Sequence, residues 1–402
     1  MKRLTAWALC ALLLTGLLAG CRAAGQDGGE SRGSQPSASL EPNTASRESA
    51  PQTDVLKTGL AVITSAADSM PAAGEEGLAD IGSTAVALLV DGDGRIAACA
   101  IDAVQSRIPF TADGALALNA GTVFPSKREL GKDYGLAEAS GIGREWYEQT
   151  AAFASYVTGK TIAEVKGMAL DERTAPTEAE LSSSVTIAVG GFIDGIEKAA
   201  RNAQALGARE GDFLGLGIAT NMRNSKGAGE SEGTAQADST YAAVSFAPDG
   251  TITSCVLDGS QGAVRFDGSG AITSDLNGPF RTKNELGDSY GMREASGIGK
   301  EWYEQAAAYA RYAAGRTVGE LEELSVTEKG APAGGELASS VTISVGPFNE
   351  ALRKQYQAEL EAEARYAKLA ARAGEQACMF EALARDEGRH AKTIYCILQQ
   401  TL

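Results

Sequence analysis

The chain has 402 residues, 44% of them hydrophobic, and a formal net charge of -16 at pH 7. This length allows two or three domains, each with its own core. Nucleic acids and anionic membrane surfaces repel so acidic a chain, so neither is expected as a partner.

The first 21 residues have the pattern of an export signal. A basic "MKR" precedes an apolar run that ends in "LLAG" and Cys21. The run is too short for a stable membrane span. Its end resembles the lipobox of bacterial lipoproteins, in which the cysteine becomes the lipidated first residue; an ordinary signal peptide cut nearby is the alternative. We predict lipidation of Cys21 and an extracytoplasmic protein anchored to the bacterial cell membrane.

Residues 22–52 are predicted to be a flexible linker. They are rich in Gly, Ser, Pro and charged residues and contain almost no large apolar side chain. Such a segment cannot bury enough surface to order itself.

Residues 53–205 and 209–350 are predicted to be two tandem copies of one domain. Trp302 lies 156 residues after Trp146, and the same shift relates Cys255 to Cys99 without any insertion or deletion. Both cysteines sit in strand-like alternations, which favours small buried thiols. A disulfide between the two copies is a further possibility that the sequence alone does not decide.

Each copy mixes strand and helix patterns. In the first copy, residues 84–102 are two strand-like runs around a Gly-Asp turn, which predicts a hairpin. Residues 143–159 and 191–203 have apolar residues at helical spacing, and 183–190 are a short strand or turn. Strand-like runs outnumber helices and do not alternate with them regularly. We therefore expect an α+β fold with two copies of a small sheet-plus-helix domain.

Three motifs recur in the same order in both copies. The first is Asp-Gly-(Arg/Thr)-Ile, the second is Ser-Gly-Ile-Gly just before a helix, and the third is Glu-x-x-Ser-Ser-Val-Thr. They lie at 93–96 and 249–252, at 140–143 and 296–299, and at 180–186 and 336–342.

This order resembles the FMN-binding domain of extracytoplasmic flavoproteins, which include the flavin-carrying subunits of ion-pumping redox complexes. In that family the last motif is Asp-x-x-Ser/Thr-Gly-Ala-Thr, and a flavin transferase that uses FAD joins the threonine hydroxyl to the FMN phosphate. The resemblance implies acceptors at Thr186 and Thr342, acidic positions at Glu180 and Glu336, and a transferase as a partner.

The last motif departs from the family pattern. Ser184 and Ser340 replace a glycine, and Val185 and Val341 replace an alanine, so both changes add bulk beside the hydroxyl. Two alternatives to covalent flavin therefore stay open. One is a non-covalent flavin or another planar ligand, and the other is a β-strand with a buried threonine in a scaffold that has lost the cofactor.

The glycine and tryptophan positions before and in the helix are further candidates for FMN contact. The family has an equivalent glycine pair close to the flavin, and N–H groups at a helix N-terminus attract phosphate. The tryptophans could stack on the flavin ring, although a tryptophan on an amphipathic helix also commonly anchors a core. The candidates are Gly141, Gly143, Gly297, Gly299, Trp146 and Trp302.

Residues 351–402 are predicted to be an α-helical hairpin, because they are rich in Ala, Glu, Leu and Arg. His390, the only histidine, follows Glu387 at the spacing with which helix bundles bind iron. The segment resembles one hairpin of the rubrerythrin and ferritin-like group, which implies Glu359, Glu387 and His390 as iron ligands. One hairpin is half a bundle, so the site would need a homodimer; otherwise these side chains are merely solvated.

These patterns together favour redox chemistry over hydrolysis. No Ser-His-Asp, Cys-His, Walker or HExxH pattern occurs, and no catalytic residue is assigned. The sequence predicts a membrane-anchored electron-transfer protein with FMN in one or both repeats, exchanging electrons between the repeats and with redox partner proteins. The alternative is a cofactor-free binding or structural lipoprotein that retains only the fold.

Overall fold

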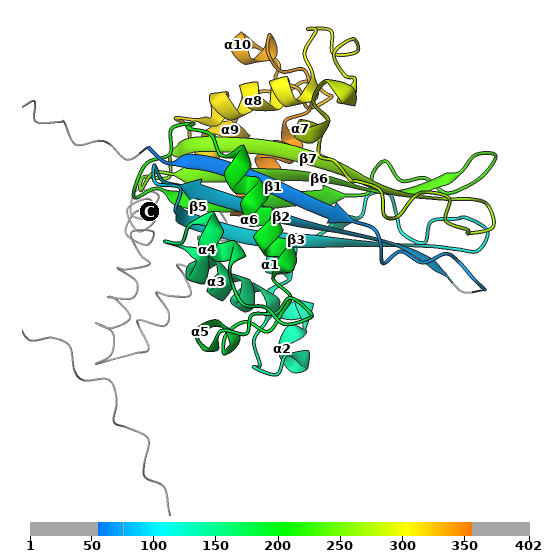
Figure 1. Cartoon of the computed structure of the whole chain (residues 1–402). Coiled ribbons are helices and arrows are strands. Elements are labelled where there is room, and N and C mark those ends of the chain that lie inside the picture. Colours follow the sequence, from blue (N-terminus) through cyan, green and yellow to red (C-terminus); the bar gives the residue numbers. More distant parts are fainter. Residues whose placement is uncertain (1–54, 75, 356–402) are drawn as a thin grey trace, which may run out of the picture. The chain divides into compact units, whose positions relative to one another are not determined.

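The computed structural model describes residues 55–74 and 76–355 (Figure 1). They form two antiparallel sheets covered by helices, which confirms the α+β class. Cys21, Glu359, Glu387 and His390 lie outside the described residues, so the predicted lipid anchor and iron ligands are not described here.

The first sheet has the order β1 (Lys57–Ser65), β2 (Gly77–Val90), β3 (Ile96–Phe110). The turn between β2 and β3 closes where the Asp-Gly pattern predicts a hairpin. There the Asp91 carboxylate accepts hydrogen bonds from the backbone N–H groups of Asp93 and Arg95, at 2.9 and 2.8 Å.

The second sheet repeats this arrangement 156 residues later. It contains β5 (Phe213–Asn221), β6 (Gly233–Phe246) and β7 (Ile252–Phe266), with the two-residue strand β4 (Val123–Phe124) at its edge.

Strand β4 comes from the first repeat but pairs with the second. Phe124 pairs with Thr220 of β5, and the equivalent Phe280 forms a bridge with Thr64 of β1. Each repeat therefore adds a short extended segment to the edge of the other repeat's sheet.

The two sheets pack face to face, and their shared cores draw equivalent residues from both repeats. Phe110 and Phe266 occupy equivalent positions, and their rings stack with centroids 4.1 Å apart. Beyond the strands, the Ala72 N–H donates to the Gly270 carbonyl oxygen and the Ala228 N–H to that of Gly114. These reciprocal contacts give the pair of repeats the character of a two-fold dimer within one chain.

Long helices cover the outer face of each sheet. Helices α3 (Trp146–Val157) and α6 (Gly190–Asn202) pack on the first sheet. Helix α8 (Trp302–Ala313) and the helical residues 346–355 pack on the second. Figure 1 shows α3, α4 and α5 on one side of the sheets and α8, α9 and α10 on the other.

The remaining helices are single turns. The expectation that strands outnumber helices is wrong, because one-turn helices are too short to show a helical period. They are α1 (Lys127–Leu130), η1 (Gly131–Tyr134), α2 (Leu136–Ala139), α4 (Ile162–Lys166), α5 (Ala179–Ser182), α7 (Lys283–Leu286), η2 (Gly287–Tyr290), α9 (Val318–Glu322) and α10 (Gly335–Ala338).

The two repeats pack as one compact unit. Two equivalent ion pairs join them: Lys198 Nζ lies 2.7 Å from Glu285 Oε1, and Lys354 Nζ lies 3.0 Å from Glu129 Oε1. The helix over 346–355 runs across the boundary expected at residue 350.

Candidate functional site

A buried glutamine brings two of the repeated motifs together in repeat 1. Gln149 lies on α3, and its Oε1 accepts hydrogen bonds from the Thr186 backbone N–H at 2.8 Å and from the Thr186 hydroxyl at 3.2 Å. Its Nε2 donates to the Arg144 carbonyl oxygen at 3.1 Å. We call residues 140–144, Gln149 and Thr186 the first motif cluster.

The same arrangement occurs in repeat 2. Gln305 accepts from the Thr342 N–H at 2.8 Å and its hydroxyl at 3.2 Å, and donates to the Lys300 carbonyl oxygen. Residues 296–300, Gln305 and Thr342 form the second motif cluster. Sequence reasoning missed both glutamines, although "EWYEQ" ends on one in each copy.

The threonine side chains are exposed, not buried. Thr186 and Thr342 lie in loops that follow α5 and α10, while the preceding Val185 and Val341 are buried in the helix–sheet cores. The alternative of a β-strand with a buried threonine is therefore wrong. The valines anchor the segment in the core, while each threonine is an exposed residue whose hydroxyl is held by the buried glutamine.

Three of the four candidate glycines are required for backbone geometry. Gly143, Gly297 and Gly299 have φ of 64°, 66° and 65°, in the left-handed region that other residues rarely adopt. A Cβ atom on any of these or on Gly141 would meet no atom within 4 Å. Open space therefore lies beside the loop in both motif clusters.

The structure places both tryptophans in the core, as the core-anchor alternative expects. Trp146 is 5% exposed and Trp302 is 6% exposed. The ring of Trp146 meets Phe192 edge-on, and Trp302 meets Phe348 in the same way. A lysine lies over each indole, so little ring surface is left for a planar ligand.

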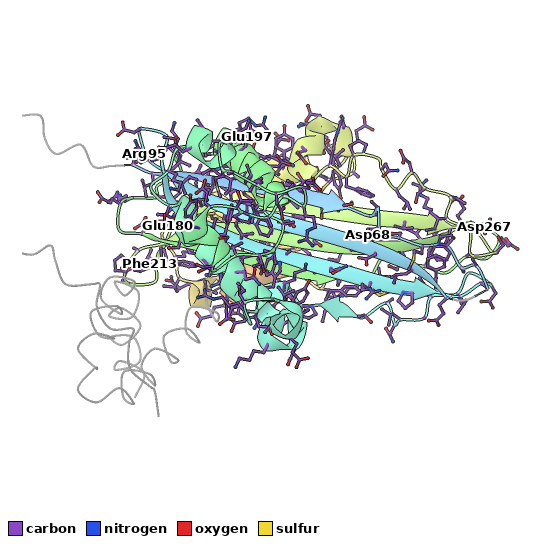
Figure 2. The ribbon with its side chains drawn as sticks, turned by 60° about the horizontal axis from the view of Figure 1, so that its bottom comes forward. Asp68, Arg95, Glu180, Glu197, Phe213 and Asp267 are labelled. Carbon is purple, nitrogen blue, oxygen red and sulfur yellow. The ribbon has the colours of Figure 1, made fainter. Side chains whose placement is uncertain are left out.

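The acidic positions of the third motif are exposed. Glu180 lies on α5 (labelled in Figure 2) and Glu336 on α10. Among the described residues, neither carboxylate forms a hydrogen bond or an ion pair. The buried Glu145 and Glu301 instead hold the glycine loops, by accepting from the backbone N–H groups of Leu136 and Met292 at 2.9 Å.

Asp102 and its equivalent Asp258 are buried aspartates that sequence reasoning missed. Asp102 and Asp258 are 3% and 7% exposed, at the ends of "AID" and "VLD". Each accepts a 3.1 Å hydrogen bond from the N–H of Arg128 or Asn284 in the following helical turn. Burial raises the pKa of each carboxyl to about 6, although these hydrogen bonds act in the opposite direction.

The two cysteines are free thiols in different cores. Cys99 packs with the helices of the first sheet and Cys255 with those of the second. Burial raises the pKa of each thiol to about 12, which makes both poor nucleophiles.

No family model and no solved structure matches this chain. A chlorophenol reductase from Desulfitobacterium hafniense is 46% identical over 44 residues, which are 11% of this chain and 14% of that protein. Within residues 55–74 and 76–355, no helix is long and apolar enough to span a bilayer, and no group of three or more His, Cys, Asp or Glu could hold a metal ion.

Proposed function

We propose that this chain is a membrane-anchored extracytoplasmic electron-transfer protein that carries FMN on Thr186, on Thr342 or on both. The observation that supports this most directly is the motif cluster. In each repeat one buried glutamine holds an exposed threonine hydroxyl beside the Ser-Gly-Ile-Gly loop.

The residues of the motif clusters fit an attached flavin phosphate. The threonine hydroxyl donates to the glutamine Oε1, so its lone pairs are free to face the solvent. Ser184 and Ser340 replace the family's glycine without backbone strain, since Thr174 is the one described non-glycine residue with positive φ. When bound, FMN supplies the electron transfer, while the protein positions it.

The fold separates the two acceptor positions. Thr186 follows α5 and Thr342 follows α10, and Figure 1 shows these two helices on opposite sides of the sheets. We therefore expect each flavin to exchange electrons with an external partner rather than with the other flavin.

The test is the intact mass and visible spectrum of protein exported by its native host. We expect added mass equal to one or two FMN groups, and a yellow colour that survives denaturation. Thr186→Ala and Thr342→Ala should each remove the flavin at their own position. Ser183→Ala and Ser339→Ala are matched controls, because they remove exposed hydroxyls three residues earlier.

Two other outcomes would replace this proposal. A colour lost on denaturation, with no added mass, would indicate non-covalent flavin. An unmodified, colourless protein would leave a cofactor-free binding or structural lipoprotein. The iron site of Glu359, Glu387 and His390 stays a separate prediction, tested by iron analysis of the full chain and of His390→Ala.

A further inference from the structure

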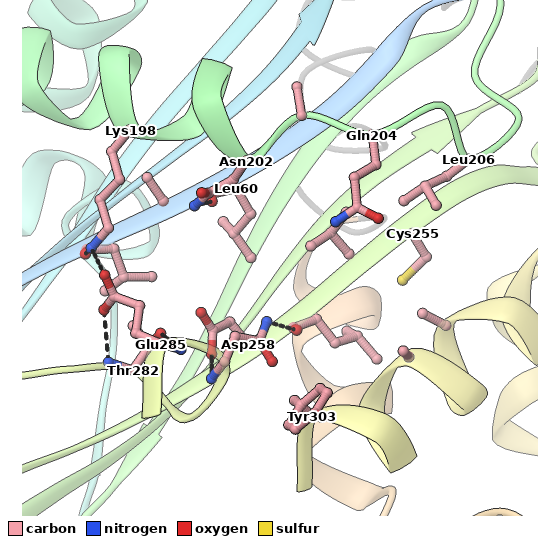
Figure 3. Close-up of a pocket in the computed structure, with 18 of the residues that line it drawn as sticks. Leu60, Lys198, Asn202, Gln204, Leu206, Cys255, Asp258, Thr282, Glu285 and Tyr303 are labelled. Carbon is pink, nitrogen blue, oxygen red and sulfur yellow. Dashed lines mark hydrogen bonds and ion pairs between the residues drawn. The ribbon is translucent and has the colours of Figure 1, made fainter. Parts of the chain in front are cut away.

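A groove of about 690 Å³ lies where the two repeats meet, within the usual size range of small-molecule sites. Its floor comes from β1 and β7, and its walls come from α6 on one side and α8 on the other, with α7 at one end (Figure 3). Each repeat supplies part of the lining.

Several polar residues in the groove already have partners within the protein. Lys198 pairs with Glu285 and also donates to the Val62 carbonyl oxygen at 2.6 Å. Asn202 donates to the Leu60 carbonyl oxygen at 3.0 Å. The Lys198–Glu285 pair joins the two repeats, whereas the other two hydrogen bonds lie within repeat 1, and none of these groups is available to a ligand.

Two arginines also line the groove, one on each wall. Arg201 on α6 and Arg311 on α8 are exposed, and neither forms an ion pair with another described residue. Glu197, near Arg201, is already paired with Lys166 at 2.9 Å. The rest of the lining is mixed: Leu60, Leu206, Ala307 and Ala310 are apolar, whereas Gln204, Asp258 and Glu285 are polar, and Glu285 is neutralised by its ion pair with Lys198.

Comparison of the repeats separates the structural residues from the arginines. Most of the paired or buried groove residues recur in the other repeat, although Asn202 corresponds to Ala358; Arg201 and Arg311 correspond to Gln357 and Ser155. The recurring pairs are Lys198 with Lys354, Asp258 with Asp102, Glu285 with Glu129, and Tyr303 with Tyr147. Packing of the repeats therefore accounts for the shared residues but not for the arginines.

We propose that this groove binds a small aromatic molecule that carries anionic groups. The guanidinium groups of Arg201 and Arg311 would pair with the anionic groups, since arginine forms strong charge-assisted hydrogen bonds with them. The alanine and leucine side chains would cover the ring, with Tyr303 beside it (Figure 3). This site uses neither Thr186 nor Thr342 and goes beyond the electron-transfer proposal.

Calorimetric titration of the full chain in neutral detergent with naphthalenedisulfonate tests the proposal. We expect one molecule bound per chain. Arg201→Gln and Arg311→Gln should each weaken binding about tenfold or more. Arg223→Gln and Arg281→Gln are matched controls, because they remove exposed arginines outside the groove and should leave binding unchanged.

A second pair of variants tests the location. Ala307→Trp fills the groove without changing its charge and should abolish binding, whereas Ala151→Trp, at the equivalent position of repeat 1, should not. Unchanged affinity in the double arginine variant, or equally tight binding of neutral naphthalenediol, would overturn the proposal. Binding should persist in Thr186→Ala/Thr342→Ala, so failure here is distinct from failure of the flavin proposal.

Discussion

The two motif clusters have the same framework but differ in how firmly the glycine loop is tied down. In repeat 2, the Arg293 guanidinium contacts Asp288 at 2.7 Å, Glu304 at 2.9 Å and the Gly299 carbonyl oxygen at 3.1 Å. The equivalent position in repeat 1 is Ala137, which can make none of these contacts.

The threonine hydroxyl of repeat 2 also has more hydrogen-bond acceptors around it than that of repeat 1. The single hydroxyl proton of Thr342 is shared between two acceptors, the Ser296 carbonyl oxygen and Gln305 Oε1, each at 3.2 Å, whereas Thr186 has only the Gln149 acceptor among the described residues. The duplicated fold thus presents one motif twice, with a looser loop around Thr186. If FMN attaches as proposed, we expect the two threonines to differ in how easily they are modified, and the difference to depend on loop residues outside the repeated motifs.

The largest expected effect comes from a glycine that only one repeat requires. A Cβ atom on Gly217 would lie 1.8 Å from the Ala351 carbonyl oxygen in the helix over 346–355, whereas the equivalent position in repeat 1 is already Ala61. We expect Gly217→Ala to lower the free energy of unfolding by about 3 kcal/mol or more, measured by urea denaturation. Gly82→Ala is the control, since its Cβ would meet nothing within 4 Å. Equal stability of the two variants would show that the second repeat is not packed as described.

The next prediction is a pH dependence of the free energy of unfolding, which should be equal in the two repeats. Asp102 and Asp258 have a pKa of about 6 in the fold and about 4 in the unfolded chain, so the native state binds more protons between these values. Each aspartate should therefore lower the free energy of unfolding by about 2 to 3 kcal/mol as the pH rises through this window. Urea unfolding at both ends of the window, for wild type, Asp102→Asn and Asp258→Asn, measures this. If one of the two variants alone removed the whole pH dependence, the two aspartates would not be equivalent.

A smaller effect should distinguish the glycine loop of repeat 1 from that of repeat 2. Exposed ion pairs of the Arg293 kind contribute about 0.5 to 1 kcal/mol, which corresponds to about a two- to fivefold change in an equilibrium. If FMN attaches as proposed, Thr186 should carry more of it than Thr342, and Arg293→Ala should raise the share on Thr342 by about that factor. Mass spectrometry of the two threonine peptides measures the shares. Ala137→Arg is the converse variant, and no change in either share would remove the proposed role of loop stiffness.

An effect of similar size concerns one unpaired hydroxyl. Within residues 55–74 and 76–355, Ser106 Oγ is the buried side-chain polar atom without a hydrogen-bond partner, and the equivalent residue in repeat 2 is Gly262. We expect Ser106→Ala to raise the free energy of unfolding by about 1 kcal/mol, because it removes a desolvated group. Ser126→Ala should lower it by about the same amount, since Ser126 caps α1. A loss of stability in Ser106→Ala would mean that the hydroxyl has a partner in solution.

The sequence predicted those parts of the fold that have a long periodic pattern. The β2–β3 hairpin, α3 and α6 were predicted because alternation and helical spacing persist over many residues. The two-residue strand β4 and the one-turn helices have no such period. Pairing of β4 with the other repeat depends on tertiary packing, which a local pattern does not contain.

The candidate site was predictable in part for a similar reason. The order of the motifs identified the glycine loop and the threonine, but Gln149 joins them through a buried amide that no motif spacing indicates. Burial likewise sets the pKa of Asp102, and a sequence does not show which of many aspartates will be buried. The tryptophans illustrate the converse, because a residue that suggests ligand stacking fills the core instead.

The exchanged edge strands have a consequence for biosynthesis. Neither half of the chain completes its own sheet, since Phe124 pairs with β5 and Phe280 with β1. The first half, which is synthesised first, must therefore expose an apolar face until the second half folds against it. Cutting the chain between residues 205 and 209 and supplying the two halves separately should yield a one-to-one complex. A single half supplied alone should instead pair with another copy of itself, which is how an ancestor with one repeat would have folded.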